Sequence, residues 1–148
     1  MALGTGISCT QQLPVVTTLN QCLLRGDVIL STEGKQSVLD AMKEWASLTD
    51  RMKDALEKRD YSEIPSLLNR NFDLRCEVCA DAISRKNRQM VELARKTGAS
   101  AKFTGSGGAI IGTYEDEKMF GSLVRTLRAF QIDVIKPVIV KNQKDAWK

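Results

Sequence analysis

Histidine is absent from the sequence, and aromatic residues make up only 5% of it. Imidazole is the side chain that most often transfers protons or binds metals near neutral pH, so a histidine-based triad is excluded and other groups must do any such chemistry. Residues 1–13 contain neither a basic start nor a long apolar run, which argues against a secretory signal and a membrane span. We therefore expect a cytoplasmic chain without a membrane partner.

Cysteine is also scarce, and its spacing does not suggest a disulfide framework. The four cysteines are Cys9, Cys22, Cys76 and Cys79, and a cytosolic chain would keep them reduced. Cys76 and Cys79 form a C-x-x-C pair, but no second pair completes the four ligands of a zinc site. We favour core positions over metal ligation for both, because free cysteine is among the most buried residue types.

Charge of one sign is not concentrated anywhere in the chain. The 22 basic and 18 acidic residues give a net charge of +4 and alternate along the sequence, which indicates a solvated mixed surface that suits an anionic ligand. Basic α+β domains often bind nucleic acid. Sheet-based RNA-binding domains, however, stack bases on exposed aromatic residues, whereas the strands predicted below carry mainly Ala, Ser, Ile and Val, with Phe103 and Tyr114 as exceptions. We expect no nucleic-acid partner.

The helical pattern is strongest in the middle of the chain. Apolar residues recur at steps of three and four over residues 35–58, which predicts an amphipathic helix. A second helix is predicted from about residue 62 to residue 83, with Pro65 tolerated in its first turn. A third is expected over residues 84–97, and Gly98 follows where a left-handed cap residue is favoured.

The pattern then changes to strands. Residues 99–104 and 109–114 read as a hairpin around a glycine loop at 105–108. A fourth helix starts near Asp116, and residues 132–140 form a last strand whose proline favours an edge position. Three helices followed by strand, strand, helix and strand predict an α+β domain, with an antiparallel sheet that has helices packed on one face.

The chain has the size and hydrophobic content of one globular domain, because 43% of its 148 residues are hydrophobic. We assign this domain to residues 35–140. Residues 1–34 have no strong period and are poorly assigned, with short strands conceivable at 13–18 and 28–31. Residues 141–148 form a charged tail.

The glycine loop Gly105-Ser106-Gly107-Gly108 is the first candidate for chemistry. Without side chains at three of its positions, backbone N–H groups can point into a concavity and approach a phosphate closely. A glycine-rich loop is also the ordinary way to reverse a chain in a hairpin. Both interpretations stay open on these residues alone.

The second predicted helix places polar residues on its apolar side. At 100° per residue, Asn71 and Arg75 fall near the centre of the apolar face. A charge there needs a partner, so Arg75 should meet a ligand or form an internal salt bridge with Asp73, Glu77 or Asp81. The face consists of Ile64, Leu67, Leu68, Phe72, Val78, Cys79 and Ala82.

Two motifs resemble a known family. The run from Gly98 to Ala109 is similar to the third conserved motif of the GHMP kinases, which include galactokinase, homoserine kinase and mevalonate kinase. Upstream, Leu67 to Arg75 resembles the corresponding helix of plant family members that phosphorylate the sugar acid glucuronate. The similarity covers roughly residues 25–140. It implies the carboxy-terminal, ferredoxin-like α+β domain of that family.

The resemblance also implies an activity and a site. The activity is ATP- and Mg²⁺-dependent phosphorylation of glucuronate at its anomeric hydroxyl, which gives glucuronate 1-phosphate for the salvage of UDP-glucuronate. Residues 105–108 would lie on the phosphate side of the nucleotide, and Asn71, Arg75 and Thr104 would bind the sugar. A guanidinium fork suits the sugar carboxylate because it can engage two oxygens at once. We assign no catalytic residue and no metal ligand within this chain.

One part of the family pattern is missing. The main phosphate loop of GHMP kinases, a Pro-x-x-x-Gly-Leu-Ser-Ser-Ser segment, belongs to an amino-terminal domain, and no such segment occurs here. Residues 4–8 contain two glycines but no recognisable helix follows them. The chain should therefore have little or no turnover unless a partner chain or self-association supplies that domain. The alternative is a non-catalytic domain that binds a small acidic metabolite or docks on a complete kinase through an exposed apolar surface.

Overall fold

The computed structural model of the chain describes residues 7–10, 32–105 and 108–137. The conceivable strands at 13–18 and 28–31 and the charged tail at 141–148 lie outside these residues. In the described part of the chain, no helix is both long and apolar enough to cross a membrane.

The described residues form four α-helices close to those expected. They are α3 (Thr32–Lys58), α4 (Ile64–Val78), α5 (Arg85–Lys96) and α6 (Glu117–Arg128). The prediction that the second helix continues to residue 83 is wrong, because α4 ends at Val78 and a short 3₁₀ turn, η1 (Ala80–Ala82), follows.

Side chains cap the starts of α5 and α6, and a glycine follows the end of α5 as predicted. The Ser84 side chain accepts a hydrogen bond from the Asn87 N–H at the start of α5, and the Asp116 side chain does the same for Met119 at the start of α6. Gly98 follows α5 with a φ of +93°, a left-handed conformation that glycine adopts without steric cost.

The sheet contains one strand that the pattern did not predict. Its strands are β1 (Ile7–Thr10), β2 (Lys102–Phe103), β3 (Ala109–Gly112) and β4 (Asp133–Ile135), in the order β2-β3-β1-β4 with all neighbours antiparallel. β2 and β3 form the expected hairpin and β4 lies at an edge as predicted. β1 comes from the poorly assigned segment and pairs with both β3 and β4.

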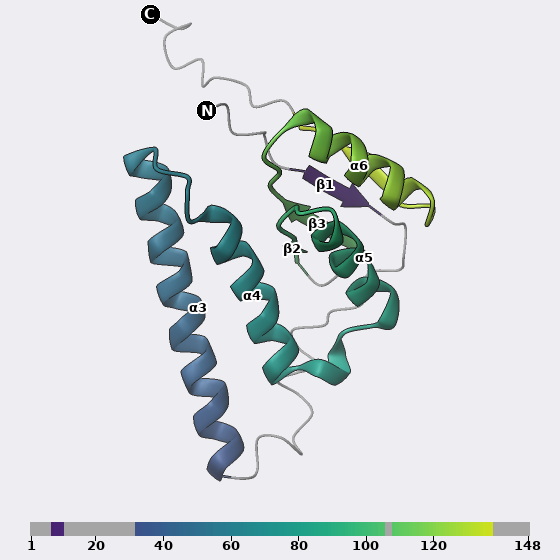
Figure 1. Cartoon of the computed structure of the whole chain (residues 1–148). Coiled ribbons are helices and arrows are strands. Elements are labelled where there is room, and N and C mark those ends of the chain that lie inside the picture. The colour runs from purple at the N-terminus through teal and green to yellow at the C-terminus, as the bar shows by residue number, and fades with distance from the viewer. Residues whose placement is uncertain (1–6, 11–31, 106–107, 138–148) are drawn as a thin grey trace, which may run out of the picture.

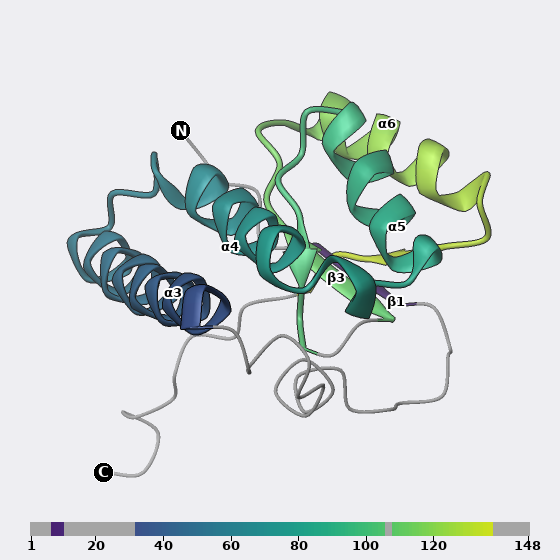
Figure 2. The same cartoon turned by 90° about the horizontal axis from the view of Figure 1, so that it is seen from below.

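The helices form two groups around this sheet. α5 and α6 lie together over one face, whereas α4 runs beside β2 and α3 packs on the outer side of α4 (Figures 1 and 2). This is the α+β arrangement that the sequence predicts, with helices on one face of an antiparallel sheet.

Two apolar clusters hold the elements together. The main core lies between α5, α6, the sheet and Phe72 of α4, and its Leu127 and Val91 are fully buried. The second cluster joins α3 to α4 through Ala41, Leu48, Leu67 and Leu74. Each large side chain buried in these clusters contributes roughly 1.5–3 kcal/mol relative to its exposed state. α4 is therefore buried on both of its flanks.

Gly112 in β3 allows an unusually close approach of two backbone segments. A Cβ atom built on it would lie 1.8 Å from the carbonyl oxygen of Ser100, so no other residue fits without moving the chain. Ser100 is held beside β3 by its side chain, which accepts a hydrogen bond from the Thr113 N–H over 2.9 Å. This contact fixes the segment that leads into β2 and the glycine loop.

Candidate functional site

The candidate site lies along the side of α4 that neither cluster covers. Leu67 and Leu74 face α3 and Phe72 faces the main core, and Asn71 and Arg75 lie half-buried on the strip between these two faces. The expected single apolar face is therefore two separate faces. The strip is where α4 can present polar groups without burying them completely.

Arg75 reaches from α4 to the glycine loop. Its Nη1 donates a hydrogen bond to the carbonyl oxygen of Gly105 over 2.8 Å, although the two residues are 30 positions apart. The guanidinium carbon lies 5.4 Å from the centre of the Phe103 ring, and this ring packs edge-on against Phe72. The structure thus brings together the two features that the sequence analysis identified separately.

The internal salt bridge considered for Arg75 is not observed among the described residues. Asp73 pairs with Arg95 and Glu77 pairs with Arg70, each over 2.6 Å. Burial lowers the pKa of Arg75, as expected for a cation removed from water without a carboxylate beside it. Arg75 is thus bound through a neutral carbonyl and an aromatic face.

The glycine loop is a hairpin turn held by a neighbouring helix. Thr104 N–H donates to the Ala109 carbonyl over 3.3 Å, and Gly108, with a φ of +80°, donates its N–H to Asn87 Oδ1 over 3.0 Å. Gly105 has open space where a side chain would project. Ser106 and Gly107 lie outside the described residues. The hairpin is confirmed, and a ligand role of the loop remains a prediction.

Asn71 and Thr104 are close in sequence to the two residues of the Arg75–Gly105 contact. Asn71 lies one helical turn before Arg75, and Thr104 immediately precedes Gly105. The backbone carbonyl of Asn71 accepts a hydrogen bond from Trp45 Nε1 over 3.2 Å, which ties α4 to α3. Among the described residues, nothing hydrogen-bonds to the Asn71 side-chain amide, and Thr104 is exposed next to Gly105. Both side chains are available to a ligand, and their roles remain predictions.

The sequence analysis missed the group that positions α4 against the strands. Arg95 of α5 donates to Asp73 over 2.6 Å and to the carbonyl oxygens of Asn69 and Ala101 over 2.8 and 3.2 Å. The Asn69 side chain in turn accepts from the Ala101 N–H over 3.0 Å. Arg95 lies in the last turn of its helix, where a basic residue is common, so its position carried no signal of this role.

Lys102 is a second cation close to Arg75. A strand lysine beside a hairpin is more often merely solvent-facing, but Lys102 is half-buried. Burial lowers its pKa, and the positive charge of Arg75 lowers it further. Like charges disfavour one another, and an anion bound beside both cations would relieve this repulsion.

The cysteines do not form a metal site. Cys76 is a free, half-buried thiol that packs against the main core, and burial raises its pKa. Cys79 is disulfide-bonded, so the expectation of a reduced thiol is wrong for this residue. In the described ranges, no group of three or more acidic, cysteine or histidine side chains could hold a metal ion.

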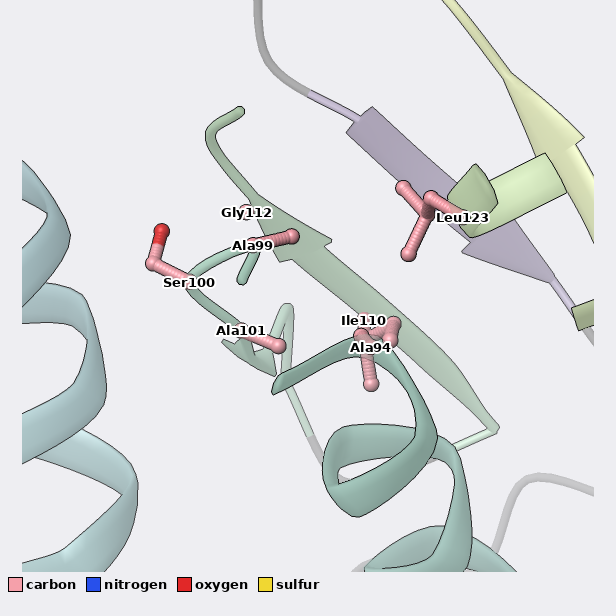
Figure 3. A pocket seen from close by; sticks show the side chains of 7 residues that line it. All are labelled: Ala94, Ala99, Ser100, Ala101, Ile110, Gly112 and Leu123. Carbon is pink, nitrogen blue, oxygen red and sulfur yellow. The ribbon is translucent and has the colours of Figure 1, made fainter. Parts of the chain in front are cut away.

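A crevice near Gly112 is too small for a substrate. Its volume is about 10 Å³, which is room for a single water molecule. Figure 3 shows that small aliphatic side chains surround it between β3, α5 and α6. The lining residues are Ala94, Ala99, Ser100, Ala101, Ile110, Gly112 and Leu123. We interpret it as a packing gap of the main core.

The chain belongs to the GHMP kinase family. Residues 52–132, more than half of the sequence, match the family model described as "GHMP kinases C terminal". This match includes α4, the glycine loop, Arg75 and Lys102, and it confirms the resemblance seen in the two motifs.

Two curated relatives within this family are named as glucuronokinases. The chain is 48% identical over 80 residues to "Probable glucuronokinase 2" and 41% identical over 80 residues to "Glucuronokinase 1", both from Arabidopsis thaliana. Each match covers 53% of this chain and 22% of the relative, so the chain spans about a fifth of the length of these two proteins.

Solved structures show the same fold. The mevalonate kinase of L. major, determined in complex with R-mevalonate, superposes with a TM-score of 0.66 at 18% identity, over 92% of this chain and 44% of that one. The Lin0012 protein of Listeria innocua superposes with a TM-score of 0.75 at 16% identity, over 89% and 38%. The predicted C-terminal GHMP kinase fold is thus confirmed.

Proposed function

We propose that this chain is the sugar-binding, carboxy-terminal part of an ATP-dependent glucuronokinase that acts in the cytoplasm. The complete enzyme would transfer a phosphoryl group from ATP to the anomeric hydroxyl of D-glucuronate. The observation that carries the proposal is the 48% identity over 80 residues to a protein named "Probable glucuronokinase 2". The contact between α4 and the glycine loop lies within residues 52–132, which match the family model.

The contact fits recognition of an acidic sugar. One Nη of Arg75 is held by Gly105, which fixes the plane of the guanidinium and leaves its other N–H groups for the two oxygens of a carboxylate. Asn71, one helical turn away, would bind sugar hydroxyls, and Thr104 would contact the sugar beside the loop. Arg75 thereby orients the substrate.

The same loop would face the phosphates of ATP. The N–H of Gly105 donates no hydrogen bond among the described residues, so it is available to an anion, whereas the N–H of Gly108 is already held by Asn87. ATP with Mg²⁺ supplies the phosphoryl group and neutralises its charge, and phosphoryl transfer then depends mainly on positioning and electrostatic stabilisation. In this chain we assign the loop to positioning and no residue to catalysis.

The domain assignment follows from this proposal. Residues 35–140 are the GHMP kinase C-terminal domain, and the main nucleotide site belongs to a part of the enzyme that this chain does not contain. We therefore expect the chain alone to bind glucuronate with little or no turnover. A partner chain that carries the nucleotide site would have to supply the rest for activity.

A chimera tests the assignment directly. The 80-residue segment of Glucuronokinase 1 that matches this chain is exchanged for the corresponding residues here, and ATP-dependent phosphorylation of glucuronate is measured. We expect an active chimera whose Arg75→Ala variant loses activity on glucuronate, with Arg85→Ala, at the exposed start of α5, as the matched control. A folded chimera that phosphorylates a neutral sugar in preference to glucuronate would refute the proposed substrate.

A docking role is the second candidate, and one observation favours it. Leu39, Met42 and Leu56 on α3 are each more than half exposed, with 51%, 54% and 54% of their surface accessible, so the outer side of this helix carries apolar surface. A docking domain would bind a complete kinase or itself through α3 without binding a sugar. Sedimentation of the chain combined with a calorimetric titration of glucuronate distinguishes the two. The docking role predicts association without heat of sugar binding, and the sugar-binding role predicts heat of binding.

A further inference from the structure

Lys102 lies at the edge of the sheet, on the face that α5 and α6 leave open. In the hairpin register Lys102 is opposite Ile111, and Phe103 is opposite Ile110. Phe103 and Ile110 are buried in the main core, and successive side chains of a strand point to opposite faces. Lys102 and Ile111 therefore point away from the core. β2 is also the strand that runs beside α4, the helix that carries Arg75 (Figure 1).

Two other arginines in or beside α4 already have carboxylate partners. Arg70 is bound by Glu44 and Glu77, with its shortest contacts at 2.6 Å, and Arg95 is bound by Asp73 over 2.6 Å. In the described residues neither Arg75 nor Lys102 forms an ion pair. Arg75 contacts Phe103, the chain neighbour of Lys102, and Gly105, so the two half-buried cations lie at the same hairpin, and no carboxylate of the described residues pairs with either. Such an arrangement costs stability unless an anion relieves it.

We propose that Lys102 is a second anion-binding residue beside Arg75, and that the pair selects a sugar that carries a carboxylate over its neutral counterpart. The inference rests on the proposed function and adds to it a residue and a basis for specificity. Arg75 supplies a planar fork fixed by Gly105, and Lys102 supplies a point charge on a flexible stem. A neutral sugar would leave both cations uncompensated, so the pair discriminates against it.

The test is a calorimetric titration of the 148-residue chain with glucuronate and, separately, with glucose. Lys102→Met should weaken glucuronate binding by about tenfold or more, because a hydrogen bond to a charged group is lost, and should leave the much weaker glucose binding unchanged. Lys118→Met removes an exposed lysine of α6 and serves as the matched control. The inference is overturned if the two variants bind glucuronate equally well, or if no sugar acid binds the chain.

Other outcomes separate this inference from the proposed function. If galacturonate binds in a way that depends on Lys102 and glucuronate does not bind, the role of the Arg75–Lys102 pair is supported and glucuronate is refuted as the substrate. If glucuronate binding is unaffected by Lys102→Met while the chimera phosphorylates glucuronate, the proposed function stands and the pairing fails. Inorganic phosphate that binds more tightly than any sugar acid, with the same dependence on Lys102, would overturn the carboxylate assignment.

A second readout does not depend on affinity. Selective ¹³C labelling of lysine lets NMR follow the titration of Lys102, whose resonance is assigned by its absence from the spectrum of Lys102→Met. Because the Arg75 charge lowers the pKa of Lys102, Arg75→Met should raise that pKa in the free chain, and saturating glucuronate should raise it in the unsubstituted chain. A pKa of Lys102 that moves with neither change would show that the two cations do not share a ligand.

Discussion

Replacing Arg95 with methionine should destabilise the chain more than any other substitution of a charged residue near α4. The change leaves the carbonyl oxygens of Asn69 and Ala101 without their side-chain donor and Asp73 without its cation. It also removes a guanidinium that lies 5.1 Å from the centre of the Phe72 ring. Arg95 therefore joins α5 to both α4 and the segment before β2.

The magnitude follows from these contacts. Each abandoned carbonyl costs about 1 kcal/mol, and the lost packing on Phe72 adds about 0.5–1 kcal/mol. Asp73 contributes little more, because its side chain is 44% exposed and water can replace the arginine. The free energy of unfolding should fall by about 2–4 kcal/mol, of which Arg95→Lys should recover only part because lysine lacks the planar fork.

Urea denaturation followed by circular dichroism measures this loss as a shift of the midpoint at constant slope. Arg85→Met is the matched control, since Arg85 lies at the exposed start of the same helix. A loss for Arg95→Met no larger than that of the control would refute the claim that this side chain joins the two helices. A change in slope instead would show that the substitution altered the unfolded ensemble or the two-state behaviour.

Four further outcomes are expected. Gly112→Ala should abolish folding or cost more than about 3 kcal/mol in urea denaturation, because its Cβ would overlap the Ser100 carbonyl oxygen; an expressed variant of unchanged midpoint would contradict the close approach. Leu127→Ala should lower the free energy of unfolding by about 2–5 kcal/mol, and a loss under 1 kcal/mol would mean that this side chain is not in the core. Asp116→Ala should cost about 1 kcal/mol through the lost cap, and Asp116→Asn should restore most of it by the same measurement. Folding lowers the pKa of Lys102 below its unfolded value near 10.5. The free energy of unfolding of the unsubstituted chain should therefore rise relative to that of Lys102→Met as the pH increases from the folded to the unfolded pKa. A difference in free energy between the two chains that stays constant over this pH window would contradict the burial of the amine.

The local signals in the sequence predicted most of the helical layer and the hairpin. The helix starts near Ser84 and Asp116 and the left-handed Gly98 depend on residues within one or two turns of each position. The 105–108 hairpin is equally local. These features need no knowledge of distant partners, which is why they could be read from one sequence.

The features that the sequence did not predict depend on distant partners. β1 is four residues long and pairs with strands about 100 and 125 positions away, so no local period marks it. The two faces of α4 are another example, because a helical wheel gives the angle of Phe72 and Leu74 but not which neighbour covers each. Arg75 was identified as a candidate from the sequence, but its contact with the hairpin depends on how α4 docks beside β2.

The central position of β1 has a consequence for how this domain assembles. Among the described strands, β4 pairs with β1 and not with the β2–β3 hairpin, so residues 7–10 join β4 to the rest of the sheet. The hairpin and the helices α5 and α6 can form from neighbouring segments. β1 must instead close a loop of about 100 residues, at a cost in chain entropy, before its hydrogen bonds to β3 can form. Completion of the sheet therefore comes late in folding, and a chain shortened by its first ten residues would lose two strands rather than one.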